Sequence, residues 1–314
     1  MANRTIAQCE KEIVSSYKTA LDAIRVKMVR LYEKYSTDGK LTYAEMTKYN
    51  RLATMEAEII ETLKGTTKEV TKNIDRLIAE NYEQSFFRTA WAVDQSTGIG
   101  LKWGLINKET IKAAVKNDLY HLAKKGLAET SLVAVNRTVV QGLIQGQSMP
   151  KMGRAIAKAL DRSLSDGLRI ARTEGLRAVS LGELSAIDRA KDRGVQVKTR
   201  WVASLDDKTR DSHRALDGTY KDDENGGWYV PGLGYVAGPR LSGSPGFDIN
   251  CRCDVAPEIE GLEPTLRRTK EGVVPYTNYE DWHKNMVKNG GTYKPERYIT
   301  LPEETVNKMR NESN

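Results

Sequence analysis

Residues 163–194 read SLSDGLRIARTEGLRAVSLGELSAIDRAKDRG, and this stretch decides the fold class of the chain. Its apolar side chains recur at steps of three and four residues, the spacing of one face of an α-helix. The apolar positions are Leu168, Ala171, Leu176, Val179, Leu184 and Ile187. Gly194 then offers the C-cap that commonly ends a helix. We therefore predict a long helix over residues 163–193.

Similar stripes precede this stretch. They predict a helix over residues 6–35, and a second that begins after a Thr42 cap and continues to about residue 78. Further helices are expected at about 108–127, 129–145 and 150–161. After the second of these helices, residues 81–107 combine four Phe and Trp side chains with three glycines and predict a compact, turn-rich elbow. These residues are Phe86, Phe87, Trp91, Trp103, Gly98, Gly100 and Gly104.

The pattern changes after Gly194. Residues 195–203 alternate apolar and polar side chains, as a half-buried strand does, and the segment up to Cys253 is rich in turns. The sequence thus predicts an α+β protein with a helical arm over 1–107. A helical segment leading into a small α+β domain would follow over 108–256, and an irregular tail over 257–314. One short helix is expected in the tail, at 279–287.

Composition narrows the class of protein. The chain has 314 residues, of which 39% are hydrophobic and 29% charged, which is typical of long solvated helices or of large surfaces shared with partners. No run approaches the roughly 18 apolar residues of a membrane span, and the charged N-terminus does not resemble a secretory signal. We therefore expect no membrane association. The chain has three cysteines, and a single residue separates Cys251 from Cys253. Because a disulfide between these two would be strained, we expect the cysteines to be in a reducing environment.

Positive charge is concentrated in the middle of the chain. Residues 151–200 carry 12 Lys and Arg against 6 Asp and Glu, whereas residues 201–314 carry 15 against 19. Such a basic region could contact nucleic acid or an acidic partner surface, or it could be a solvated helical face. The candidate contact residues are Arg154, Arg162, Arg169, Arg177, Arg189, Arg193 and Arg200.

Three segments of the chain are distinctive when taken together and in order. The first is Ile170-Ala-Arg-Thr-Glu174, with Ala178 and Gly182 further along the same helix. The second runs from Trp201 through Asp206, Arg210 and His213 to Asp217-Gly218, and the third is Asn250-Cys-Arg-Cys253. In this order and spacing they resemble the Mu F-like family of phage minor head proteins. The resemblance covers roughly residues 130–285, about half of the chain.

The resemblance implies a structural component of the virion rather than an enzyme, and it implies no cofactor. Such proteins are minor capsid proteins that lie inside the phage head and act in head assembly or in DNA packaging and ejection. The implied partners are the portal protein, the major capsid or scaffolding protein, and possibly the packaged DNA. The protein would occupy the host cytoplasm during assembly.

The family also suggests a zinc site. Many members place two cysteines in the second segment and a histidine with two cysteines in the third, which could hold a tetrahedral metal. The matching positions in this chain are Arg210, His213, Asp248, Cys251 and Cys253. Because an arginine cannot bind a cation, we expect His213, Cys251 and Cys253 to be a relic that packs without a metal.

Without a metal, charged groups would have to hold these segments together. Arg210 and Arg252 could pair with Asp206, Asp211 or Asp217, whose carboxylates accept the fork of an arginine. Trp201 would supply an apolar floor, and Gly218 the positive φ of a turn. We expect Arg172 and Glu174 to join this network or to cap it. The alternative is a solvated ion pair of little energetic consequence.

Four other functions are open to the sequence. The basic region allows a virion-internal DNA-binding protein, and Asp206, Asp207, Asp211 and His213 allow a metal-dependent nuclease. ADP-ribosyl transfer would have to rest on the tripeptide Arg172-Thr-Glu174, which alone lacks the second glutamate and the strand-borne serine. A cysteine nucleophile would need a positioned histidine, and His213 could approach Cys251 and Cys253.

Overall fold

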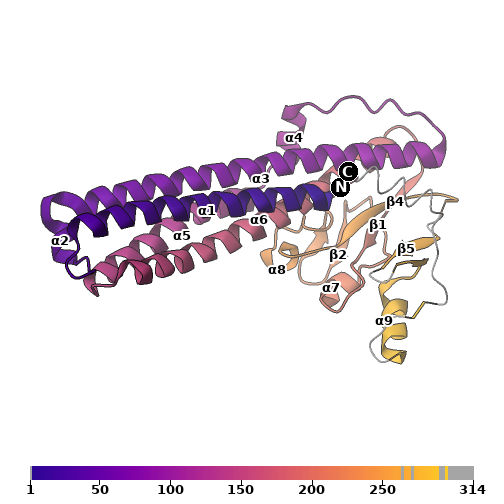
Figure 1. Cartoon of the computed structure of the whole chain (residues 1–314). Coiled ribbons are helices and arrows are strands. Elements are labelled where there is room, and N and C mark those ends of the chain that lie inside the picture. Colours follow the sequence, from indigo (N-terminus) through magenta and orange to yellow (C-terminus); the bar gives the residue numbers. More distant parts are fainter. Residues whose placement is uncertain (1, 263–264, 270–271, 290–293, 296–314) are drawn as a thin grey trace. The chain divides into compact units, whose positions relative to one another are not determined.

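The computed structural model of the chain describes residues 2–262, 265–269, 272–289 and 294–295 (Figure 1). Long helices come first and short antiparallel strands follow, which confirms the predicted α+β class. The chain forms two compact units. Residues 3–79 and 116–175 make one, called here the helical unit; residues 1–2, 80–115 and 176–314 make the other, called here the mixed unit. Within the described ranges, no helix combines the length and the apolar character needed to cross a membrane.

Four long segments run side by side in the helical unit (Figure 1). They are α1 (Ala2–Tyr35), the first part of α3 (Arg51–Thr97), α5 (Asp118–Ile144) and the first part of α6 (Met149–Lys191). Each buries its apolar stripe, and the buried side chains include Ile13, Ile24, Met28, Leu63, Ile74 and Leu143. Full burial of such a side chain stabilises a fold by about 1.5–3 kcal/mol, so this shared stripe holds the four segments together.

The connection from α1 to α3 has the predicted cap but not the predicted helix. Thr42 accepts a hydrogen bond from the Glu45 N–H and begins the short helix α2 (Tyr43–Thr47). A 3₁₀ turn, η1 (Lys48–Asn50), follows, and within it Tyr49 has a φ of 54° that interrupts the helix. The single helix expected from residue 43 is therefore divided, and α3 starts at Arg51.

The predicted elbow over residues 81–107 is wrong for residues 81–97. α3 continues to Thr97, and Tyr82, Phe86, Ala90 and Val93 extend its buried stripe. The three glycines all follow the end of this helix. Aromatic residues at three- and four-residue steps continue a helix as readily as they fill a turn, and the glycines alone marked the true break.

The later helix boundaries also differ from the prediction. The helix expected over 108–127 ends early, as α4 (Lys108–Ala114). Asn117 then caps α5, which continues through residue 128, where the prediction had placed a break. α6 merges the two helices expected at 150–161 and 163–193 into one of 43 residues. Gly194 closes it as predicted, with a φ of +84°.

Short antiparallel strands build the mixed unit. β1 (Val197–Val202) pairs with β4 (Asp254–Ile259), which places Trp201 opposite Val255. β2 (Trp228–Val230) pairs with β3 (Gly234–Val236) in a separate ladder. After the short helix α7 (Asp211–Arg214) the chain returns to β1, where Gly218, at a φ of +79°, donates its N–H to the Trp201 carbonyl.

The main core of the mixed unit lies around Trp201, which is fully buried. Helix α6 contributes to this core, and so does the segment around the short helix α8 (Pro245–Asp248). The buried members are Leu184, Trp201, Ala203, Leu216, Trp228, Val230, Val236, Phe247, Cys251, Cys253 and Val255. Two of the three cysteines therefore act partly as core residues.

The tail contains a hairpin that the sequence did not predict. β5 (Leu266–Arg268) pairs with β6 (Val273–Pro275), and α9 (Tyr279–Lys288) confirms the predicted short helix. Val274, Tyr279 and Trp282 form a small core there, with Leu205 packed against it. The rest of the predicted tail, residues 296–314, lies outside the described residues.

Candidate functional site

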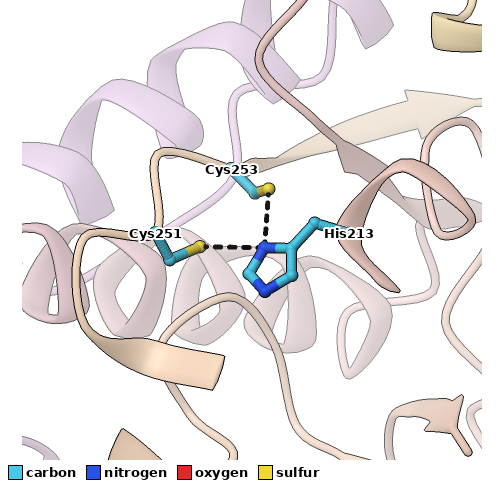
Figure 2. A group of neighbouring side chains, drawn as sticks. All are labelled: His213, Cys251 and Cys253. Atoms are coloured by element: carbon cyan, nitrogen blue, oxygen red, sulfur yellow. Dashed lines mark hydrogen bonds between the residues drawn. The ribbon is translucent and has the colours of Figure 1, made fainter. Parts of the chain in front are cut away.

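His213, Cys251 and Cys253 meet in the interior of the mixed unit (Figure 2). The Nδ1 of His213 lies 3.3 Å from the Cys253 sulfur and 3.5 Å from the Cys251 sulfur. All three side chains are buried, and their potential ligand atoms lie within 4.8 Å of one another. In the described part of the chain, no other group of His, Cys, Asp and Glu side chains has this spacing.

Local structure brings the three side chains to one point. His213 lies on α7, and the neighbouring Arg210 donates hydrogen bonds to the carbonyl oxygens of Phe247 and Ile249. The two cysteines follow directly on α8, where the Cys251 N–H donates to the Asp248 carbonyl at 3.2 Å. Arg210 was expected to pair with a carboxylate; it binds backbone carbonyls instead and so ties α7 to the cysteine segment.

Aromatic rings fix the imidazole in place. Phe247 lies 4.1 Å from the His213 ring, and Trp201 meets the same ring edge-on at 6.0 Å. Trp228 in turn meets Trp201 edge-on at 5.3 Å. The Nε2 of His213 is buried and has no hydrogen-bond partner among the described residues. Packing, rather than a hydrogen bond to Nε2, therefore orients Nδ1 toward the two sulfurs.

Arg240 is the charged residue of this site that the sequence did not suggest. Its side chain is only 2% exposed. The guanidinium donates to the carbonyl oxygens of Cys251 and Cys253, and to the Ser180 hydroxyl at 2.6 Å. One of its nitrogens lies 3.9 Å from the Cys251 sulfur. Arg240 therefore holds the backbone of both cysteines and places a positive charge beside a thiol.

The electrostatic environment distinguishes the two thiols. The hydrogen bond from Cys253 lowers the pKa of Cys251; burial opposes this, and His213 and Arg240 add to it. The same hydrogen bond, together with burial, raises the pKa of Cys253. Cys251 is therefore the more acidic of the two thiols, and its sulfur lies beside an imidazole and a guanidinium. Sulfur and imidazole donors of this kind are ligands for soft cations.

Two ion pairs hold the surrounding loops. Arg252 pairs with Asp206, one of the pairings that the sequence suggested. Burial raises the pKa of Asp206, but the hydrogen bond and charge of Arg252 outweigh it and leave this pKa below its usual value. Asp217 pairs with Arg267 of the tail hairpin, both nearly buried. The sequence identified Asp217 but not its partner, because Arg267 lies in the segment expected to be irregular.

Arg172 and Glu174 do not contact the site as expected. Both belong to the helical unit, where Arg172 pairs with Glu10 and Glu174 accepts two hydrogen bonds from Asn117. The reason is distance along α6. Ser180, which does contact Arg240, lies six residues beyond Glu174, or about 9 Å along a helix.

The seven predicted contact arginines fall into two groups. Five have partners within the protein. Arg177, Arg189 and Arg193 donate to backbone carbonyls, Arg169 pairs with Asp166, and Arg200 forms a buried pair with Glu258. Burial removes Arg177 and Arg200 from any contact surface, which corrects the prediction for these two. Arg154 and Arg162 are exposed and have no polar partner in the described part of the chain.

A basic stripe remains on α6 of the helical unit, formed by Lys151, Arg154, Lys158 and Arg162. Steps of three and four residues place these four exposed side chains on one face of the helix. Lys158 and Arg162 also line a groove of about 450 Å³ between α5 and α6, with Arg137 of α5. None of these five cations has an ion pair within the described ranges.

The matching family model defines the class of protein. The model described as "Phage Mu protein F like protein" matches residues 134–256. The Minor head protein GP7 of Bacillus phage SPP1 is 30% identical over 289 residues, which cover 89% of this chain and 93% of that protein. The chain therefore belongs to the Mu F-like family of phage minor head proteins. It has a structural role in the phage head and is a component of the virion.

Two further relatives are longer than this chain. The NAD(+)–arginine ADP-ribosyltransferase EFV of Enterococcus faecalis is 28% identical over 300 residues, or 93% of this chain and 60% of that protein. An uncharacterized protein of Haemophilus influenzae is 26% identical over 213 residues, or 61% of this chain and 44% of that protein. The chain thus spans about half of the length of these two relatives. No solved structure matches the chain.

Proposed function

We propose that this protein is attached to the portal or to the inner face of the phage shell, where it acts in head assembly and in DNA packaging or ejection. In this proposal it reaches the head from the host cytoplasm and catalyses no reaction. One feature of the helical unit carries the proposal. α5 buries one apolar face in the unit and leaves further apolar side chains exposed on the other.

The exposed apolar residues of α5 lie on one side of the helix. Leu122, Val133 and Ile144 are 63%, 58% and 65% exposed. They recur every 11 residues, which is about three helical turns, so they point in the same direction. A row of exposed leucine, valine and isoleucine is unfavourable in water and is suited to burial against another protein. An attachment surface on the portal or shell would bury it.

Charge substitutions on α5 test this attachment. The double variant Leu122→Asp/Ile144→Asp should reduce co-purification with the portal protein or major capsid protein of the same phage by at least about tenfold, because a buried unpaired carboxylate opposes association. Val26→Asp, at an exposed valine of α1, is the control and should retain the partner. Equal recovery with the α5 variant, or no partner with the unaltered protein, would contradict the proposal.

Several observations favour a structural role over a nuclease or an ADP-ribosyltransferase. Asp206 is engaged by Arg252, Asp211 pairs with Arg214 at the surface, and His213 faces two sulfurs. These groups therefore do not converge as the carboxylates of a nuclease would. Arg172-Thr-Glu174 lies within α6, with partners inside the helical unit.

The basic stripe on α6 favours a second function, contact with packaged DNA. Four exposed, positively charged side chains on one helical face can neutralise the phosphates of a DNA backbone. If all four neutralise phosphates, the logarithm of the affinity for double-stranded DNA should fall with the logarithm of salt concentration, with a slope of about −3 to −4. Fluorescence anisotropy with a labelled duplex measures this slope.

A charge-matched pair of variants separates the stripe from the overall charge of the protein. Arg154→Glu/Arg162→Glu should weaken DNA binding at least about tenfold and flatten the salt dependence. Lys11→Glu/Lys18→Glu on α1 makes the same change in net charge and should have a much smaller effect. Similar losses in both variants would indicate non-specific attraction, and no DNA binding by the unaltered protein would remove this second function.

A further inference from the structure

We propose that the groove between α5 and α6 binds an acidic segment of a partner protein in an extended conformation. The groove lies entirely within the helical unit, and Arg137 of α5 lines it together with Lys158 and Arg162 of α6. The DNA contact proposed above needs only the row of cations on α6. The groove adds Arg137 and a set of uncharged side chains, so it goes beyond that function and is tested separately.

The charge of the groove is of one sign. Arg137, Lys158 and Arg162 are exposed and have no ion pair within the described ranges. Among the described residues that line the groove, none carries a carboxylate. Like charges that share a groove repel one another, and a segment with carboxylates would remove this repulsion. The two arginines can each bind a carboxylate through a pair of parallel N–H donors, so the groove favours aspartate and glutamate side chains.

The dimensions of the groove fit one extended chain. Along α5 the groove extends from Ala134 to Gln145, a span of about 16 Å at the rise of a helix. An extended chain advances about 3.3 Å per residue, so about five residues would occupy this length. Ala155 and Ala159 of α6 also line the groove, and with Ala134 they are half-buried. Because these side chains are small, a bound chain could lie close to both helices.

Amide side chains favour an extended segment over a helical one. Gln141 and Gln145 of α5 are exposed and line the groove toward the turn that precedes α6. The Gln145 oxygen accepts a hydrogen bond from Gln147 at 2.7 Å and keeps its own N–H donors, and an amide carries two donors and one acceptor. An extended segment offers unpaired backbone groups to such amides, whereas a helix has already paired its own.

The lining of the groove suits a peptide better than a nucleic acid. Single strands are usually held by aromatic side chains on which the bases stack, and none of the described residues that line the groove is aromatic. A DNA duplex is wide and convex, so it would contact the exposed row of α6 rather than enter the groove. Lys151 and Arg154 belong to that row but do not line the groove, so they should serve a duplex and not a peptide.

Fluorescence anisotropy of the full chain tests the proposal with three labelled probes: an oligoglutamate peptide, an oligoglutamine peptide of the same length and a DNA duplex. Oligoglutamate should bind at least about tenfold more tightly than oligoglutamine, because only oligoglutamate carries carboxylates. If both peptides bind equally, or neither binds, the proposal is overturned. If the duplex does not bind, the DNA contact fails, but the comparison of the two peptides still decides the groove.

A matched pair of charge reversals locates the binding. Arg137→Glu should weaken oligoglutamate binding at least about tenfold and change duplex binding less than about threefold. Arg154→Glu makes the same change in net charge outside the groove, so it should weaken duplex binding and leave oligoglutamate binding nearly unchanged. Ala159→Leu, which narrows the groove at constant charge, should weaken oligoglutamate binding at least about fivefold. Circular dichroism checks that each variant keeps its helices.

Two outcomes of the variant series would overturn the groove as a peptide site. Equal oligoglutamate affinities of the Arg137→Glu and Arg154→Glu variants would show that net charge alone attracts the peptide. A greater loss of duplex binding than of oligoglutamate binding in Arg137→Glu would assign the groove to DNA instead.

Discussion

Replacing Asp217 by alanine should lower the free energy of unfolding of the mixed unit by about 3–5 kcal/mol, because it leaves the Arg267 charge buried without its partner. The Asp217 carboxylate is 1% exposed and accepts two hydrogen bonds from Arg267 at 3.0 Å. It also accepts hydrogen bonds from the N–H groups of Ala203, just beyond β1, and of Tyr279, at the start of α9. One side chain therefore joins the end of β1, the tail hairpin and α9.

Urea unfolding followed by tryptophan fluorescence measures this loss, since all five tryptophans lie in the mixed unit. Asp211→Ala is the matched control: this carboxylate is 97% exposed, and its pairing with Arg214 should contribute less than about 1 kcal/mol. The double variant Asp217→Ala/Arg267→Leu should recover part of the loss, because it removes the unpaired charge as well. A loss as small as that of Asp211→Ala would show that the tail is not held through this carboxylate.

The ligand set of the site could be read from the sequence, but its environment could not. The resemblance to the Mu F-like family identified His213, Cys251 and Cys253, because these positions match the histidine and cysteine pattern of that family. Arg240 and Arg267 were not, because an arginine is usually exposed and nothing in their local sequence marks them as buried. Their roles depend on carbonyl groups and a carboxylate that come together only in the folded chain.

The fold, too, could be predicted from the sequence only in part. Apolar steps of three and four residues predicted the helices themselves, because this spacing is a property of the local sequence. Their boundaries were less certain: Phe86 and Phe87 were assigned to a turn, and α6 was divided near residue 162, where neither glycine nor proline breaks it. The hairpin β5–β6 was missed because three-residue strands are too short for alternation to show.

Gly182 has a role that can be tested with a single methyl group. A Cβ at this position of α6 would lie 2.3 Å from the Tyr82 carbonyl oxygen and 2.1 Å from the Ser85 hydroxyl, both on α3. The hydroxyl can rotate away, but the carbonyl is backbone, so the two helices would have to separate. Gly182→Ala should therefore destabilise the mixed unit by about 3 kcal/mol, the upper end of the usual cost of overpacking.

Gly65 provides a control of opposite sign. It lies within α3, and a methyl group added there would have no neighbouring atom within 4 Å, so Gly65→Ala should stabilise the protein by about 0.5–1 kcal/mol through helix propensity alone. Urea unfolding followed by circular dichroism compares the two variants, because both substitutions lie in long helices. Stabilisation by Gly182→Ala would mean that α3 and α6 do not approach as closely as the distance to the Tyr82 carbonyl requires. Destabilisation there and stabilisation at Gly65 would show that the close approach, and not the loss of a flexible residue, explains the glycine at 182.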